Sequence, residues 1–369
     1  MRNDGERPAT RRLLGDCIHG VGNCEKDANC SGRRPASQPG IVFPLPPPPG
    51  CPSMHLRLTF AACCVLAASL SGCFGTDDSP EVTRSVSVDG ITHSYHLFIP
   101  ARARSSAAPM VIALHAGGSN AQTIEDMTHL HDTARREGFL YMRPEGYNAA
   151  DLVFRTWNAG SCCGGAEEAG IDHVAVISRM IDDAESIAHV DPKRIFVTGH
   201  SNGGMMAYRL ACELSDRIAA IAPNASYLMN RDYDRLLKPL VFACQPSRPV
   251  PVLHMHGLSD TCAPYDGGQS TGPEGGQRPP VQDSIDAFVA NNRCNAEPVQ
   301  TYSNGDSHCL TFSGCEDGAD VVLCTTDSAG HVWAGSPDLG AEGVCGGQTT
   351  EALDANSMLW DFFSKHPMP

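Results

Sequence analysis

Residues 196–207, with the sequence FVTGHSNGGMMA, decide how this chain folds. An apolar run leads into Gly199-His200-Ser201-Asn202-Gly203, which fits the pattern G-x-S-x-G, and a helical pattern follows directly. This arrangement is typical of a tight strand-to-helix turn that presents a serine hydroxyl above a sheet. Glycines suit both outer positions, because a side chain there would clash with a neighbouring element or resist a positive φ. A glycine-rich turn that happens to contain a serine is the alternative, and the surrounding sequence has to decide.

Strand and helix patterns alternate on both sides of this turn. We expect a hairpin around Asp89-Gly90, then strands and helices set by apolar periodicity. The expected strands are 110–114, 139–146, 194–198, 218–223, 251–257 and 320–326, and the expected helices are 121–137, 172–188, 203–214, 284–292 and 349–364. A long irregular loop is expected at about 144–170. This alternation predicts an α/β domain whose mostly parallel sheet is covered by helices on both faces.

The first 80 residues carry other signals. Residues 1–53 lack hydrophobic periodicity and are expected to be disordered or a spurious extension. Residues 54–72 resemble a secretory signal, since Arg57 precedes a mainly apolar stretch of 13 residues at 58–70, fewer than the ~20 that span a bilayer. Leu70-Ser71-Gly72-Cys73 resembles a bacterial lipobox, which predicts lipidation of Cys73, a tether at 73–80 and a catalytic domain at 81–369. An ordinary signal peptide is the alternative.

Charge and cysteine content narrow the class of protein. The net charge of −15 disfavours a nucleic-acid partner. An even number of cysteines follows Cys73, which in an exported chain predicts disulfides: Cys162, Cys163, Cys212, Cys244, Cys262, Cys294, Cys309, Cys315, Cys324 and Cys345. Cys309, Cys315 and Cys324 are expected to staple a C-terminal loop region. No C-x-x-C occurs among the ten, so we expect no metal site.

A serine nucleophile needs a base and an orienting acid. In a doubly wound hydrolase sheet these follow in the order serine, acid, histidine. Asp260 lies just beyond the strand at 251–257, and His331 lies just beyond the strand at 320–326. We therefore predict Ser201, Asp260 and His331 as the catalytic residues, with Asp266 as the main competitor for the acid.

A tetrahedral intermediate also needs donors for its oxyanion. One donor is expected to be the backbone N–H of Asn202, at the start of a helix. The other is expected from the loop LHAGGSN at 114–120, where Gly117 is the first choice and Ala116 the next. Trp157 and Trp333 are assigned to the substrate cleft, with packing in the interior as the alternative.

Several stretches together resemble a known family: LHAGGSN, TWNAGSCCG, IDHVAVISRMI, VDPKRIFVTGHSNGGMMAYRLAC, HMHGLSDTCAPYDGG and GHVWAG. In this order they resemble the α/β-hydrolase esterases grouped as polyhydroxybutyrate depolymerase-like and feruloyl esterase-like, over roughly residues 85–365. The resemblance implies the α/β-hydrolase fold, a nucleophile at Ser201, an acid at Asp260, a base at His331 and an oxyanion loop at 115–118, so His115 is included among the substrate-binding residues.

The resemblance also implies a function. The expected activity is hydrolysis of carboxylic esters through an acyl-enzyme, without a cofactor. Expected substrates are small or oligomeric esters: feruloyl or acetyl esters of plant polysaccharide, or 3-hydroxyalkanoate oligomers. A membrane would be contacted through the lipid anchor only. The alternatives are a serine peptidase on the same fold and a non-catalytic surface-binding lipoprotein.

Overall fold

The computed structural model of the 369-residue chain describes residues 80–149, 154–336, 345 and 348–369. The predicted signal segment, the tether and Cys73 lie outside the described residues. Among the described residues, every helix is too short or too polar to cross a membrane.

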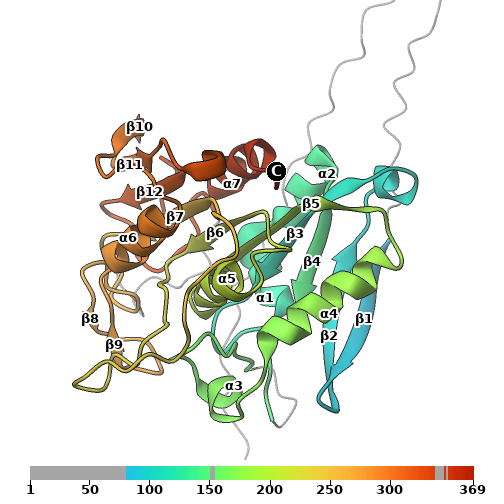
Figure 1. The fold of residues 1–369 in the computed structure, drawn as a ribbon, viewed down its shortest axis with the longest axis horizontal. Coiled ribbons are helices and arrows are strands. Elements are labelled where there is room, and N and C mark those ends of the chain that lie inside the picture. Colours follow the sequence, from blue (N-terminus) through green and yellow to red (C-terminus); the bar gives the residue numbers. More distant parts are fainter. Residues whose placement is uncertain (1–79, 150–153, 337–344, 346–347) are drawn as a thin grey trace, which may run out of the picture. The chain divides into compact units, whose positions relative to one another are not determined.

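A single large sheet organises the domain (Figure 1). Its strands lie in the order β1-β2-β4-β3-β5-β6-β7-β12-β11-β10. Their bounds are β1 Glu81–Val88, β2 Ile91–Phe98, β3 Ala108–Leu114, β4 Leu140–Pro144, β5 Val190–His200, β6 Ala220–Asn224, β7 Val252–Gly257, β10 Val299–Asn304, β11 Ser307–Phe312 and β12 Val321–Thr326. Strands β4, β3, β5, β6, β7 and β12 run parallel, and the outer strands pair antiparallel. A separate two-stranded sheet joins β8 Gly268–Gln269 to β9 Gln277–Arg278.

Helices cover both faces of this sheet, as the alternating pattern predicts (Figure 1). Their bounds are α1 Ala121–Thr128, α2 Leu130–Glu137, α3 Gly164–Glu168, α4 His173–Glu185, α5 Asn202–Glu213, α6 Val281–Asn291 and α7 Ala355–Lys365. Apolar residues of α4, α5 and α6 share one core cluster, and those of α1, α2 and α7 share another. Two cores on opposite faces are why the central strands are apolar throughout rather than alternating.

Several predicted elements need correction, and one hairpin was missed. The helix expected at 121–137 is two helices, because His129 adopts a left-handed φ of 49° between α1 and α2. β5 begins at Val190, before the strand expected at 194–198, and the irregular loop contains α3. The hairpin of β10 and β11 was not predicted, because β10 is almost wholly exposed and lacks an apolar alternation. The hairpin at Asp89-Gly90 is confirmed, with positive φ at both residues.

The ten cysteines that follow Cys73 form five disulfides. The pairs are Cys162–Cys163, Cys212–Cys244, Cys262–Cys345, Cys294–Cys315 and Cys309–Cys324. The prediction of a disulfide framework is therefore confirmed. Its expected place is only partly right, because Cys309 and Cys324 join the neighbouring strands β11 and β12 rather than a loop.

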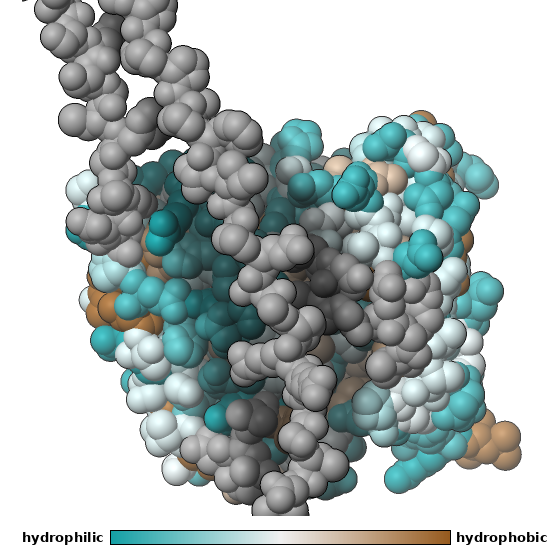
Figure 2. All heavy atoms as spheres, turned by 180° about the vertical axis from the view of Figure 1, so that it is seen from behind, coloured by the Kyte–Doolittle hydropathy of each residue, from teal (hydrophilic) through white to brown (hydrophobic). Residues whose placement is uncertain are grey.

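The surface suits an aqueous setting. On the face turned away in Figure 1, hydrophilic residues prevail and hydrophobic areas are small and separate (Figure 2). Large exposed apolar side chains do occur, among them Leu236 and Leu237 in the loop after β6. Leu240 and Val241 of the same loop are exposed as well, so this loop holds four of the large exposed apolar side chains.

Candidate active site

Ser201 stands at the sharp turn between β5 and α5. Its φ of 55° and ψ of −121° lie in a region that side-chain-bearing residues rarely adopt. The positive φ predicted for this turn thus falls on the serine and not on the flanking glycines. Gly203 serves the close approach instead, since a Cβ on it would lie 2.2 Å from the Leu114 carbonyl oxygen. The turn therefore has the geometry that presents a serine hydroxyl beyond the carboxyl end of a strand.

Asp260 and His331 meet at the same edge of the sheet. They follow the parallel neighbours β7 and β12, and His331 Nδ1 lies 2.7 Å from Asp260 Oδ2. The other carboxylate oxygen of Asp260 accepts the backbone N–H of Ala263 at 2.7 Å. Asp260 is buried, while the rival Asp266 is exposed. The hydrogen bond between His331 Nδ1 and Asp260 Oδ2 fixes the proton on Nδ1, so Nε2 of His331 is left as the basic nitrogen.

One cavity contains both the serine and the histidine. It has a volume of about 520 Å³, and its wall includes Ser201, Asn202 and His331 together with Gly117 of the loop after β3. Within the described part of the chain no hydrogen bond joins Ser201 Oγ to His331. Contacts of this kind often shorten only when substrate is bound. The structure thus brings the three predicted catalytic residues to one site without closing the serine–histidine contact.

The predicted oxyanion donors line the same cavity. Asn202 begins α5, where backbone N–H groups and the helix dipole favour negative charge. The N–H of Gly118 is used by the carbonyl oxygen of Arg155 at 2.9 Å. Among the described backbone groups, the N–H of Gly117 and that of Asn202 bond to no carbonyl, so both can serve a ligand in the cavity.

Comparison with known proteins gives a family match. Residues 93–253 match the family described as "Esterase PHB depolymerase". The chain thus carries the sequence of this esterase family over residues 93–253. It is 30% identical over 268 residues to "Feruloyl esterase B" of Piromyces equi, covering 71% of this chain but 43% of that protein. It is 24% identical to the "Bifunctional acetylxylan esterase/xylanase XynS20E" of Neocallimastix patriciarum, covering 71% of this chain and 36% of that protein. The chain thus spans less than half the length of these two relatives.

A solved structure supports the fold of this chain. The acetyl xylan esterase from Aspergillus awamori superposes with a TM-score of 0.52, covering 77% of this chain and 99% of that one at 13% identity. At this identity the match shows the α/β-hydrolase fold alone, and it confirms the fold predicted from the sequence.

Three residues predicted to bind substrate do not line the cavity that contains Ser201. His115, Trp157 and Trp333 are at most 1% exposed. Trp157 Nε1 donates to the His115 carbonyl oxygen at 2.9 Å, and Trp333 Nε1 donates to Asn356 Oδ1 at 3.0 Å. Both indoles are thus satisfied in the interior, and the prediction of substrate contact is corrected. Side chains that sequence reasoning missed, including Met127, Met205 and Phe154, stand in the cavity wall instead.

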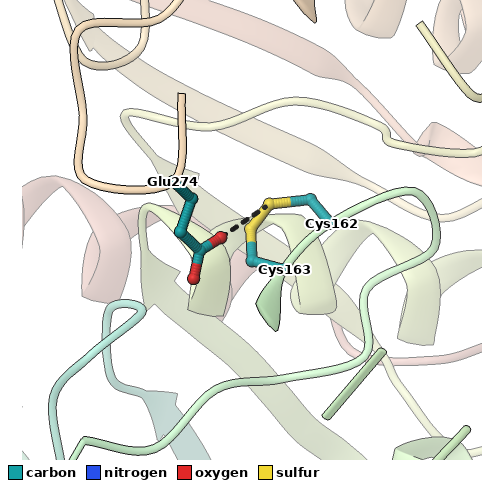
Figure 3. Close-up of side chains that lie close together, drawn as sticks. All are labelled: Cys162, Cys163 and Glu274. Atoms are coloured by element: carbon teal, nitrogen blue, oxygen red, sulfur yellow. Dashed lines mark hydrogen bonds between the residues drawn. A yellow bond between two sulfur atoms is a disulfide. The ribbon is translucent and has the colours of Figure 1, made fainter. Parts of the chain in front are cut away.

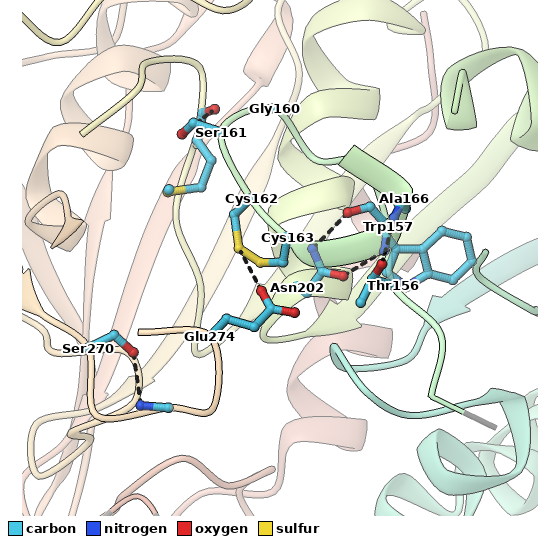
Figure 4. Close-up of a disulfide and its surroundings, with 12 residues drawn as sticks. Thr156, Trp157, Gly160, Ser161, Cys162, Cys163, Ala166, Asn202, Ser270 and Glu274 are labelled. Carbon is cyan, nitrogen blue, oxygen red and sulfur yellow. Dashed lines mark hydrogen bonds between the residues drawn. A yellow bond between two sulfur atoms is a disulfide. The ribbon is translucent and has the colours of Figure 1, made fainter. Parts of the chain in front are cut away.

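Asn202 has a second contribution through its side chain. Its Oδ1 accepts the Trp157 N–H at 2.7 Å, and its Nδ2 donates to the Trp157 carbonyl oxygen at 3.0 Å (Figure 4). Asn202 and Trp157 are both buried. The residue after the nucleophile therefore anchors the loop that carries the Cys162–Cys163 disulfide, and this anchor could not be read from the sequence.

Buried histidines surround the site and are neutral. Burial lowers the pKa of His200 to about 3 and that of His115 to about 4. His200 packs against His331 with ring centroids 4.6 Å apart. His331 becomes a cation during catalysis. Because His200 is neutral, it does not repel that cation. His254 and His256 are also buried and hydrogen-bonded.

Glu274 approaches the Cys162–Cys163 disulfide from the loop between β8 and β9 (Figure 3). Its Oε2 lies 3.6 Å from Cys162 Sγ. Since a disulfide sulfur carries no hydrogen, this contact is a hydrogen bond only when the carboxyl is protonated. Cysteine and glutamate can both ligate metals. A cysteine ligand must be a thiolate, however, and a disulfide offers none.

Proposed function

We propose that the chain is a serine carboxylic ester hydrolase that works through an acyl-enzyme. The observation that carries the proposal is the 2.7 Å bond between His331 and Asp260, in the same cavity as a serine at a strained strand-to-helix turn. The family match supports the same activity.

Each residue has a defined role in the proposed steps. His331 Nε2 takes the proton of Ser201 as Oγ attacks the ester carbonyl, and Asp260 holds the imidazole and stabilises its cationic form. The N–H groups of Asn202 and Gly117 stabilise the oxyanion. His331 then protonates the leaving alcohol, and water releases the acid by the same route.

The proposed substrates are feruloyl or acetyl esters of plant polysaccharide, or 3-hydroxyalkanoate oligomers. The names of the relatives from Piromyces and Neocallimastix support the first two classes, and the description of the family supports the third. The mixed cavity wall suits all three, since apolar side chains such as Met127 and Met205 stand beside polar ones.

A fluorophosphonate probe tests the activity, because it reacts only with an activated serine. We expect labelling of the wild-type protein at Ser201 and none of Ser201→Ala. A folded wild-type protein that resists the probe would contradict the proposal and favour a binding protein. Matched ester and amide substrates separate an esterase from a peptidase, and we expect turnover of the ester alone.

We also propose that the protein is exported and anchored through a lipid on Cys73. The supporting observation is the apolar stretch at 58–70 followed by Leu70-Ser71-Gly72-Cys73. Mass spectrometry of the N-terminus from a bacterial host would test it, with Cys73→Ser as the control. An unmodified N-terminus, or one elsewhere, would contradict the anchor.

A further inference from the structure

Two charged side chains stand in the wall of the cavity that contains Ser201. Glu274 and Arg278 both line it, and both come from the segment that includes β8 and β9. Within the described part of the chain neither makes an ion pair within 4 Å. The nearest bond of Arg278 is a long one, 3.4 Å to the carbonyl oxygen of Gln277. A charged group facing a cavity without a direct partner is available to a ligand.

Glu274 is held in place by a tight turn. The N–H of Gly275 bonds to the carbonyl oxygen of Gly272 at 2.9 Å, with Pro273 between Gly272 and Glu274. Ser270 Oγ accepts the N–H of Gly272 at 3.0 Å (Figure 4) and donates to the Cys262 carbonyl oxygen. Pro at the second position of a turn pre-sets its φ. The backbone that carries Glu274 is thus pre-organised, which lowers part of the entropy cost of binding.

The surroundings place this carboxylate close to the reacting groups. Glu274 Oε1 lies 3.8 Å from the position that a Cβ on Gly117 would occupy, next to a predicted oxyanion donor. Its Oε2 contacts the disulfide that borders the cavity through Cys163. The surrounding protein displaces water from Glu274 and raises the pKa of its carboxyl. The Glu274 side chain is also exposed, so its carboxylate is open to a ligand that supplies hydroxyl groups.

We propose that Glu274 and Arg278 form a subsite for the sugar portion of the ester. Glu274 accepts a hydrogen bond from a sugar hydroxyl, and Arg278 donates to a hydroxyl or ring oxygen. A cation alone would favour a carboxylate, but the adjacent Glu274 repels an anion. Because charges of both signs line this part of the cavity, a neutral polyhydroxylated group suits it better than an ion. The disulfide and Pro273 beside the pair offer apolar surface to the C–H face of a sugar ring.

This inference rests on the proposed esterase function and is tested by esters that share an acyl group. The two pairs are methyl ferulate with feruloylated arabinose, and methyl acetate with acetylated xylose. The measured quantity is the ratio of kcat/KM for the sugar ester to that for the methyl ester. We expect Arg278→Met and Glu274→Gln to lower this ratio roughly tenfold, the effect of losing one charge-assisted hydrogen bond. Asp266→Asn, exposed on the same segment and outside the cavity wall, is the matched control.

A ratio that stays unchanged in Arg278→Met and Glu274→Gln would overturn the subsite, whether neither ester is affected or both lose activity equally. Arg278→Gln removes the charge with a polar side chain and replaces Arg278→Met if that variant does not fold. A binding measurement separates the subsite from catalysis: in Ser201→Ala, calorimetry with the sugar ester should show a Kd about tenfold weaker after Arg278→Met. Wild-type protein that hydrolyses neither ester would refute the proposed function, while the Kd still decides the subsite.

Discussion

The Asn202 side chain offers a direct test of how the loop at 154–163 is held. In Asn202→Ala the backbone N–H stays, but the N–H and carbonyl oxygen of Trp157 both lose their side-chain partner. Leaving one buried polar group unsatisfied costs about 1–3 kcal/mol, so two should lower the free energy of unfolding by about 2–6 kcal/mol. That is a large share of the 5–15 kcal/mol or so that is typical of a domain.

Urea denaturation followed by tryptophan fluorescence would measure this loss. The matched control is Asn304→Ala, because Asn304 donates a single exposed hydrogen bond to the Ala352 carbonyl oxygen. We expect the control to change the free energy of unfolding by less than about 0.5 kcal/mol. A loss below about 1 kcal/mol in Asn202→Ala, with an unchanged m-value, would refute the reasoning that this side chain anchors the loop.

Three further predictions concern chemistry, close approach and acidity. Asp260→Asn should lower kcat on an ester about 10⁴-fold with unchanged circular dichroism, because it loses the tautomer control of His331; a loss below tenfold would point to another acid. Gly203→Ala should yield little soluble folded protein, since its Cβ would meet backbone at 2.2 Å, whereas Gly165→Ala, with nothing within 4 Å, should express normally; equal yields would contradict the close approach. Burial lowers the pKa of His115 from 6.5 to about 4, so the unfolded chain takes up more protons between these values. His115 should therefore lower the free energy of unfolding by about 3 kcal/mol as the pH drops from 6.5 to about 4. A urea midpoint that stays constant from pH 7 to pH 4 would contradict this.

The order of elements and the placement of Ser201, Asp260 and His331 could be predicted because they follow local rules. Buried parallel strands read as apolar runs, and the residues just beyond them gather at one sheet edge. A G-x-S-x-G turn then selects one serine. Each of these signals spans only a few residues of the chain, so no long-range contact had to be known.

Features that depend on distant contacts could not be predicted. Trp157 is an aromatic residue in a glycine-rich loop, a pattern that suits a cleft equally well, and only its burial and the bond of its indole to the His115 carbonyl oxygen show that it is interior. Glu274 and Arg278 lie among polar residues with no periodicity, so nothing local distinguishes them from surface charges. The break at His129 is hidden because apolar spacing continues across it from Ile124 to Ala134.

The Cys262–Cys345 bond has a consequence for the two loops that hold the acid and the base. Cys262 follows Asp260 by two residues, and Cys345 lies beyond His331 on the chain. The disulfide joins two cysteines 83 positions apart and so closes a covalent ring. His331 lies inside this ring, and Asp260 lies just before it. Local fraying of the sheet edge therefore leaves these two groups tethered. Ser201 lies outside the ring and takes its position from the end of β5 and the start of α5.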